Sequence, residues 1–338
     1  MEDPLLRQDF CCQDGAQPFG QESRTDPLPL LQRLPTRFFT GRQTMNNRPT
    51  ESGPWTVARA LQWTTAYFTG KGIQTARLDA ELLLAHALNV DRLQLYLNFD
   101  RPLLPGERQQ YRELVARRGR REPVALITGT KEFWSILFRI VPGVLIPRPD
   151  TEILVQAVLD EIRGLSSPQI LEIGTGSGAI TVAIARQRPD ARVVATDADL
   201  APVRTASTNA KDAGVASSVA FLAMDLFAAL RPGTRFDVIC SNPPYVPSDT
   251  IPTLEPEIVD FEPVKALDGG KDGLQVIRQI AQAAGDYVKA GGWLVLEIGD
   301  EQGDPAKAIL AAAGITENIR VLPDLAGRPR VIKGRIPE

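Results

Sequence analysis

The sequence predicts an α/β protein in which a small helical domain and a β-hairpin precede a doubly wound, mostly parallel sheet. From Gln169 onward, short runs of β-branched residues alternate with helical segments of about 10–15 residues, the pattern of parallel strands joined by crossover helices. Residues 55–125 instead have apolar residues at a spacing of three to four, which is typical of helices. The length of 338 residues also exceeds what one hydrophobic core usually supports, so two domains are expected.

The composition is that of an ordinary soluble globular protein, with 43% apolar and 23% charged residues. The sequence has 38 basic and 41 acidic residues. Its net charge is therefore slightly negative, and it lacks the overall positive charge that gives proteins general affinity for nucleic acid. We expect no nucleic-acid substrate. Three cysteines, two of them adjacent, indicate neither a disulfide framework nor a zinc site, so a reducing cytoplasm is expected. Apolar runs are too short for a membrane span.

Residues 1–50 mix proline, glutamine, arginine and acidic residues without a sustained period, so we expect a flexible extension. Arginine is common in mitochondrial presequences, but the acidic residues of this segment contradict one. A start of translation at Met45 is an alternative interpretation.

Residues 51–130 are expected to form the helical domain. The only histidine of the sequence, His86, lies in this domain within an apolar helical period. It is interpreted as a packed or half-exposed helix residue, not a catalyst. The domain ends in four arginines, for which a solvated helix terminus is favoured over an acidic partner. These are Arg117, Arg118, Arg120 and Arg121.

Residues 131–147 predict a β-hairpin that links the domains, with its turn at Pro142 and Gly143. Residues 148–338 then form the α/β domain. The expected strands are 169–174, 191–197, 219–225, 236–242 and 293–299, and the expected helices are 152–163, 179–187, 200–214, 273–288 and 301–313. Segments 317–324 and 328–335 predict two more strands at the edge of the sheet.

A glycine-rich loop follows the first of these strands and opens a helix. It consists of Gly174, Thr175, Gly176, Ser177 and Gly178. Glycines allow a tight turn and close approach to a ligand, and the helix N-terminus offers free N–H groups. With Ala179 in the last place the loop also satisfies a dinucleotide pattern, so a nicotinamide site and a purely structural turn both remain open.

Acidic residues end the next two strands. Asp197 stands about 20 residues after the loop, where a carboxylate accepts hydrogen bonds from ribose hydroxyls. Asp225 is placed to meet the exocyclic amine of adenine, or alternatively to cap the next turn. Together with the loop, these acids predict a nucleoside ligand.

The sequence Asn242, Pro243, Pro244, Tyr245 follows an apolar strand, at the edge where open α/β sheets bind ligands. The side-chain oxygen of Asn242 and the carbonyl of Pro243 can both accept hydrogen bonds from one planar amino group, while the ring of Tyr245 packs against it. The structural alternative is a rigid turn, since consecutive prolines fix φ.

The glycine loop, the ribose acid and this clamp together resemble the class I S-adenosylmethionine-dependent methyltransferases that act on planar amide or amino nitrogens. A longer set of motifs resembles the HemK family, the N(5)-glutamine methyltransferases of peptide chain release factors. These motifs are REPVALITG, EFWSILFRI, LIPRPDTE, SNPPYVP, FEPVKALDGGKDGL, GGWLVLEIG and DLAGRPRVI. The resemblance begins near residue 55 and runs to the end of the chain.

The resemblance implies a Rossmann-like fold, S-adenosylmethionine as cofactor, no metal, a cytoplasmic release factor as substrate, and a helical domain that recognises it. It places Gly174, Thr175, Gly176, Ser177, Gly178, Asp197, Asp225, Leu226 and Asn242 around the cofactor. It makes Asn242, Pro243, Pro244 and Tyr245 the substrate clamp, with Asn242, Pro243 and Tyr245 catalytic. Leu226 departs from relatives that have an aromatic residue there, which weakens stacking on adenine.

Three alternatives remain. A sister family methylates a glutamine of a ribosomal protein, but it usually departs from the LIPRPDTE motif. An adenine or guanine methyltransferase acting on nucleic acid can use the same clamp, but ordinarily adds a basic recognition region. A nucleotide-binding module without enzymatic activity has no need of the clamp.

Overall fold

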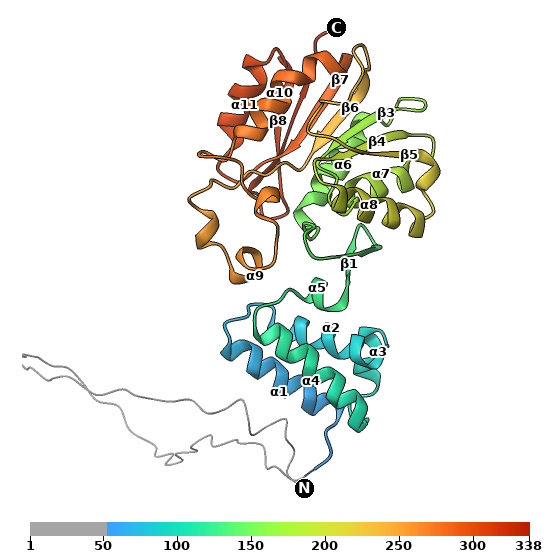
Figure 1. Cartoon of the computed structure of the whole chain (residues 1–338), viewed down its shortest axis with the longest axis vertical. Coiled ribbons are helices and arrows are strands. Elements are labelled where there is room, and N and C mark those ends of the chain that lie inside the picture. The colour runs from blue at the N-terminus through green and yellow to red at the C-terminus, as the bar shows by residue number, and fades with distance from the viewer. Residues whose placement is uncertain (1–52) are drawn as a thin grey trace, which may run out of the picture.

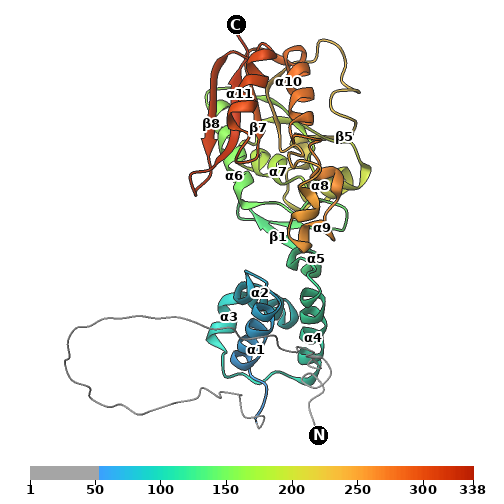
Figure 2. The same ribbon diagram turned by 90° about the vertical axis from the view of Figure 1, so that its left-hand side faces the viewer.

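The computed structural model describes residues 53–338 and comprises a helical part and an α/β part (Figures 1 and 2). The predictions for residues 1–50, including a start at Met45, lie outside the described residues. No helix within residues 53–338 is long and apolar enough to cross a membrane. The predicted fold class, a mostly parallel sheet preceded by helices, is confirmed.

The helical part has a hydrophobic core of its own. Its helices are α1 (Val57–Gly70), α2 (Ala76–Leu88), α3 (Arg92–Leu97), α4 (Pro105–Gly119) and α5 (Val124–Thr128). Helix α1 begins where the Thr56 side chain accepts a hydrogen bond from the N–H of Arg59. Val57, Leu61 and Phe68 then fall on one helical face and are fully buried against α2 and α4.

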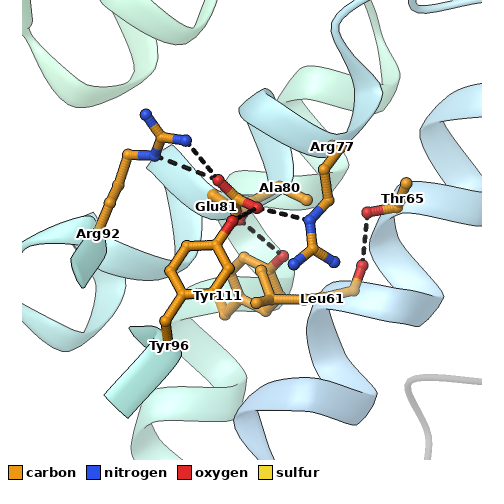
Figure 3. A network of polar contacts seen from close by, with 8 residues as sticks. All are labelled: Leu61, Thr65, Arg77, Ala80, Glu81, Arg92, Tyr96 and Tyr111. Atoms are coloured by element: carbon orange, nitrogen blue, oxygen red, sulfur yellow. Dashed lines mark hydrogen bonds and ion pairs between the residues drawn. The ribbon is translucent and has the colours of Figure 1, made fainter. Parts of the chain in front are cut away.

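A buried carboxylate joins α2 to α3 (Figure 3). Glu81, only 2% exposed, accepts hydrogen bonds from Nε of Arg77 at 2.5 Å, Nη2 of Arg92 at 2.6 Å and Oη of Tyr96 at 2.5 Å. Burial by itself would raise the pKa of Glu81, but the hydrogen bonds from Tyr96, Arg92 and Arg77 hold it below its usual range. This carboxylate is therefore fully paired.

Arg118 in the last turn of α4 and Arg121, two residues after this helix, connect the two parts of the molecule. Arg118 is 5% exposed and pairs with Asp79 at 2.7 Å and with Glu257 at 2.9 Å. Arg121 pairs with the other oxygen of Glu257 at 2.8 Å. Glu257 lies on α9 (Pro256–Val259), on the side of the α/β part that faces the helices (Figure 1). The predicted solvated helix end is therefore wrong for Arg118, because its partner comes from a distant segment.

His86 lies on the last turn of α2, as a helix residue, and is exposed, which favours the half-exposed alternative over the packed one. The interpretation that it is not a catalyst stays a prediction.

The hairpin between the two parts is present, but its turn lies elsewhere. Strands β1 (Thr130–Phe133) and β2 (Ile136–Arg139) are joined by Trp134 and Ser135, whose φ angles of 52° and 55° form a two-residue turn. The predicted turn at Pro142 and Gly143 is wrong, since both residues follow β2. A tertiary contact holds the observed turn, because the N–H of Trp134 donates to Glu152 at 2.9 Å.

The α/β part contains a seven-stranded sheet. Its strands are β3 (Gln169–Ile173), β4 (Arg192–Asp197), β5 (Val219–Ala223), β6 (Phe236–Ser241), β7 (Val288–Glu297), β8 (Glu317–Pro323) and β9 (Pro329–Arg335). The order is β5-β4-β3-β6-β7-β9-β8, and the pairs from β5 to β7 are parallel. Strand β9 is antiparallel to both neighbours, so the last two strands complete the edge as predicted.

Helices cover both faces of the sheet (Figure 1). They are α6 (Glu152–Glu161), α7 (Ala179–Gln187), α8 (Leu200–Asp212), α10 (Gln275–Tyr287) and α11 (Gly303–Ala312). Because strand side chains alternate, Val238 and Cys240 of β6 pack in the core with α6 and α7, whereas Ile239 packs in the core with α10 and α11.

The chain changes direction between β3 and β6. It proceeds from β3 outward to β4 and β5, then returns to β6 on the other side of β3. Such a switch point opens a crevice at the carboxyl ends of the two central strands. Ile173 and Ser241 are paired there, so the residues that follow them, Gly174 and Asn242, begin side by side.

Candidate active site

The glycine loop leaves β3 at the switch point and forms one wall of a cavity. Gly174 and Gly176 line it. Gly178 has a φ of 83°, and a Cβ atom on it would lie 2.9 Å from Cβ of Ala206 in α8, so only glycine fits. The loop therefore turns tightly, with α7 packed closely on α8.

Two predicted loop residues have side chains that point inward, not into the cavity. Thr175 donates its hydroxyl to Glu172 at 2.8 Å and its N–H to the carbonyl of Thr196 at 2.7 Å. Ser177 is 3% exposed, and its carbonyl accepts from Asn209 at 2.8 Å. The loop thus faces the cavity through its glycine backbone.

Asp197 ends β4 next to the glycine loop and lines the same cavity. Its two oxygens accept from the N–H of Gly176 at 3.0 Å and the N–H of Asp199 at 3.2 Å. Burial raises the pKa of Asp197, although these backbone bonds oppose the shift. Each carboxylate oxygen has a further lone pair, so the fixed carboxylate retains acceptors for ligand hydroxyls.

The turn after β5 supplies an apolar wall. Met224, Asp225 and Leu226 line the cavity, and Leu226 has a positive φ of 44°. The next turn is closed by the backbone, where the N–H of Ala228 donates to the carbonyl of Asp225 at 2.9 Å. The carboxylate of Asp225 is exposed beside the cavity.

The clamp residues follow β6 on the third side. Ser241 Oγ donates to the carbonyl of Ile173 at 2.7 Å and so ties the ends of β6 and β3 together. Asn242, Pro243 and Pro244 line the same cavity as Gly174. Nδ2 of Asn242 donates to Oγ1 of Thr151 at 3.2 Å, and no described residue donates to its Oδ1.

Tyr245 lies apart from the other clamp residues. Its hydroxyl donates to Oε1 of Glu297 at 3.2 Å, and its carbonyl accepts from Gln302 at 2.9 Å. It lines a neighbouring cavity together with Gln302. The predicted packing of its ring on the substrate stays a prediction.

Comparisons with known proteins agree on one family. The PrmC N-terminal domain matches residues 59–129, and the methyltransferase small domain matches residues 149–260. A release factor glutamine methyltransferase of Rhodopirellula baltica is 42% identical over 82% of this chain and 96% of its own length. That of Geobacter sulfurreducens is 43% identical over 83% and 97%. The chain belongs to the release factor glutamine methyltransferases. The resemblance to the HemK family is thereby confirmed.

A solved structure supports the fold of this family member. The protein is similar in fold to the catalytic domain of hMettl16, whose structure was solved in complex with the MAT2A 3′UTR hairpin 1. The match covers 66% of this chain and 80% of the hMettl16 chain. The TM-score is 0.50 at 14% identity, so this likeness concerns the fold alone.

S-adenosylmethionine is the methyl donor of such methyltransferases, and the cavity fits it. The fixed carboxylate of Asp197 suits the ribose, and Met224, Leu226 and Val276 provide apolar surface for an adenine ring. The glycine backbone leaves room beside Asn242, because a Cβ atom on Gly174 would lie 3.9 Å from the carbonyl oxygen of Asn242.

Sequence reasoning missed several residues that line this cavity. They are Gly143, Leu145, Ala198, Asp199, Pro202, Pro263, Lys265, Ala266, Val276 and Gln279. Lys265 and Asp199 approach each other to 3.4 Å at its rim. A signal existed for the former, since Lys265 falls within the FEPVKALDGGKDGL motif.

Glu172 is a further residue that was not predicted. It is fully buried at the end of β3, and its Oε2 accepts from the hydroxyls of Thr175 and Thr181. Its Oε1 has no hydrogen-bond partner among the described residues. Burial raises the pKa of Glu172 to about 7, and the nearby charge of Asp197 acts in the same direction.

Proposed function

We propose that this protein transfers a methyl group from S-adenosylmethionine to the side-chain amide nitrogen of the glutamine in the Gly-Gly-Gln loop of peptide chain release factors. One observation carries the proposal: Asn242 and the glycine loop lie side by side at the paired ends of β6 and β3. A methyl donor bound on the loop would thus face an amide held by the clamp. The names of the relatives support the choice of substrate.

The clamp addresses the main chemical difficulty of the reaction. An amide nitrogen is a poor nucleophile because its lone pair is delocalised into the carbonyl. Oδ1 of Asn242 and the carbonyl of Pro243 can accept the two N–H bonds of the glutamine amide. Both hydrogen bonds strengthen as the nitrogen becomes positive, so they stabilise the transition state more than the ground state.

Orientation supplies the rest. S-adenosylmethionine provides an electrophilic methyl group when it is bound. Asp197 and the glycine backbone would hold its nucleoside, and the clamp would hold the amide in line with the methyl group. Alignment of this kind can lower a barrier by about 7–11 kcal/mol. Methyl transfer leaves the amide nitrogen positively charged and very acidic, so it then loses a proton to water and no histidine is needed.

We assign the parts of the chain accordingly. Residues 51–130 recognise the release factor, residues 131–147 are the linking hairpin, and residues 148–338 are the methyltransferase domain. The ion pairs of Glu257 with Arg118 and Arg121 support this division of labour, because they attach the helices to the segment that follows the clamp. The substrate and the small number of cysteines favour a cytoplasmic location.

A transfer assay with labelled S-adenosylmethionine tests the proposal. An intact release factor, a ribosomal protein and a nucleic acid are offered separately, and mass spectrometry locates the added methyl group. We expect methylation of the release factor at the Gly-Gly-Gln glutamine. A methyl group at any other position, or transfer only to the ribosomal protein or nucleic acid, would refute it.

A peptide copy of the loop serves as a second substrate. Ordering a mobile loop costs conformational entropy that a short peptide cannot recover through further contacts. The intact factor should therefore be methylated much faster than the peptide. Equal kcat/KM values for the two would show that the helical part makes no contribution to recognition.

A further inference from the structure

A chain of polar groups runs behind the clamp, away from the cavity. Nδ2 of Asn242 donates to Oγ1 of Thr151 at 3.2 Å. The Thr151 hydroxyl lies near the carboxyl group of Glu297 and lowers its pKa, as a nearby donor does. Tyr245 donates its own hydroxyl to Oε1 of that group at 3.2 Å. The four residues come from the start of α6, the segment after β6, and the end of β7.

Neither Thr151 nor Glu297 touches the cavity. Thr151 is 4% exposed and Glu297 is 1% exposed, and neither lines the space beside Asn242. Oε2 of Glu297 has no directed hydrogen-bond partner among the described residues, so this carboxylate has acceptor capacity to spare. The two residues can therefore act on the reaction only through Asn242 and Tyr245.

The direction of the hydrogen bonds follows from the carboxylate. An ionised carboxylate only accepts, and a threonine hydroxyl has a single proton. When Thr151 directs that proton to Glu297, it can offer Asn242 only a lone pair. The amide of Asn242 must then present Nδ2 to Thr151, because its Oδ1 would be a second acceptor there.

This direction matters for the substrate. The amino group of a glutamine amide is a donor, so it can be bound by Oδ1 of Asn242 but not by Nδ2. We propose that Thr151 and Glu297 are positioning residues that fix which end of the Asn242 amide faces the substrate. This inference rests on the proposed function and adds two residues to its machinery.

The charge of Glu297 should make the activity depend on pH, which a residue that only packs in the core would not do. The groups facing it are Arg330 of β9, Asp150 before α6, and the hydroxyls of Thr151 and Tyr245. Burial raises the pKa of Glu297 to about 7, although Thr151 and Arg330 oppose the shift. A protonated Glu297 can donate to Thr151, whose own proton is then free to turn toward Asn242. Activity should therefore fall as the pH drops through 7.

The decisive experiment compares Thr151→Val with Thr151→Ser. Valine keeps the shape of the side chain but removes the hydroxyl, whereas serine keeps the hydroxyl. In single-turnover methylation of intact release factor, the rate of Thr151→Val should be lower by about tenfold or more. This is the effect expected when one hydrogen-bonding group is removed from an active site. Thr151→Ser should stay within about threefold of the parent protein.

Three measurements separate positioning from misfolding. Calorimetry should give Thr151→Val the same affinity for S-adenosylmethionine as the parent protein. Thr205→Val is the matched control, because this buried hydroxyl bonds only to a carbonyl of its own helix at 2.9 Å, and its rate should not change. Glu297→Gln should remove the loss of rate near pH 7, since the variant has no carboxyl group to protonate.

Failures of the two proposals are distinguishable. If the parent protein methylates the release factor and Thr151→Val does so at the same rate, the positioning role is wrong while the proposed function stands. A serine variant as slow as the valine variant, or an unchanged pH profile in Glu297→Gln, also overturns the positioning role. A parent protein that does not methylate the factor overturns both.

Discussion

Two buried carboxylates of the α/β part, Glu172 and Glu297, differ from Glu81 of the helical part in how they are paired. Glu81 receives hydrogen bonds from two arginines and a tyrosine, and its pKa lies below the usual range (Figure 3). Glu172 and Glu297 each keep one buried oxygen without a hydrogen-bond partner among the described residues. Burial raises the pKa of both to about 7.

This difference in pairing should affect the stability of the folded protein. An unpaired acceptor in a buried site costs free energy, whereas a fully paired carboxylate can stabilise the elements it joins. Glu172 supports the glycine loop through Thr175, and Glu297 stands behind the clamp. These two carboxylates thus lie behind the loop and the clamp, whereas Glu81 joins two helices. Replacing Glu172 and replacing Glu81 should accordingly change stability in opposite directions.

The largest effect is expected at the clamp. Asn242→Ala removes an acceptor that acts mainly in the transition state, so kcat should fall by about 10²-fold or more. Cofactor affinity and thermal stability should change little. Asn242→Asp keeps an acceptor and should retain more activity than alanine. The opposite order of single-turnover rates would contradict the role of Asn242.

The cofactor site should show the next largest effect. Asp197→Ala removes the carboxylate that two backbone N–H groups hold at the cavity and that we propose binds the ribose. Affinity for S-adenosylmethionine should fall by about 1.5–3 kcal/mol, the range for hydrogen bonds to a charged group. Isothermal calorimetry measures this directly. An unchanged affinity would place the ribose elsewhere in the cavity.

Glu172→Gln should stabilise the protein at high pH. The folded protein holds a proton that the unfolded chain releases between pH 4.5 and about 7, so stability is present below this window and lost as the pH rises through it. Glutamine still accepts from the threonines but carries no charge. The free energy of unfolding at pH 8 should rise by about 1–3 kcal/mol, with little change at pH 4. Urea unfolding at both pH values checks this, and an equal effect at both would contradict it.

The same substitution in the helical part should have the opposite sign. The lowered pKa of Glu81 means that its stabilising contribution is present above pH 4.5 and is lost as the pH falls through the folded pKa. Glu81→Gln should therefore lower the free energy of unfolding at pH 7 by about 1–2 kcal/mol. Its kcat should match that of the parent protein. A stabilising effect would remove the contrast between the two parts.

Local patterns in the sequence were sufficient for the order of the elements and the main motifs. The continuous apolar run around Ile239 predicts a buried strand, and the glycines from Gly174 to Gly178 predict a tight turn into a helix. These features depend on neighbours within a few residues, and they appear in the structure where they were expected. The clamp after β6 follows from the same kind of local reasoning.

Contacts between distant segments were decided only by the tertiary structure. The hairpin turn at Trp134 depends on Glu152, Arg121 meets Glu257 136 residues later, and Thr151 reaches Asn242 across 91 residues. The burial of Glu172 and Glu297 is of the same kind, because their missing partners are evident only when the surrounding strands and helices are packed. The spacing of residues along a chain encodes the period of a helix or a strand. It does not encode which side chains the packed sheet brings within hydrogen-bond distance, because that depends on the strand order and on the helices above it.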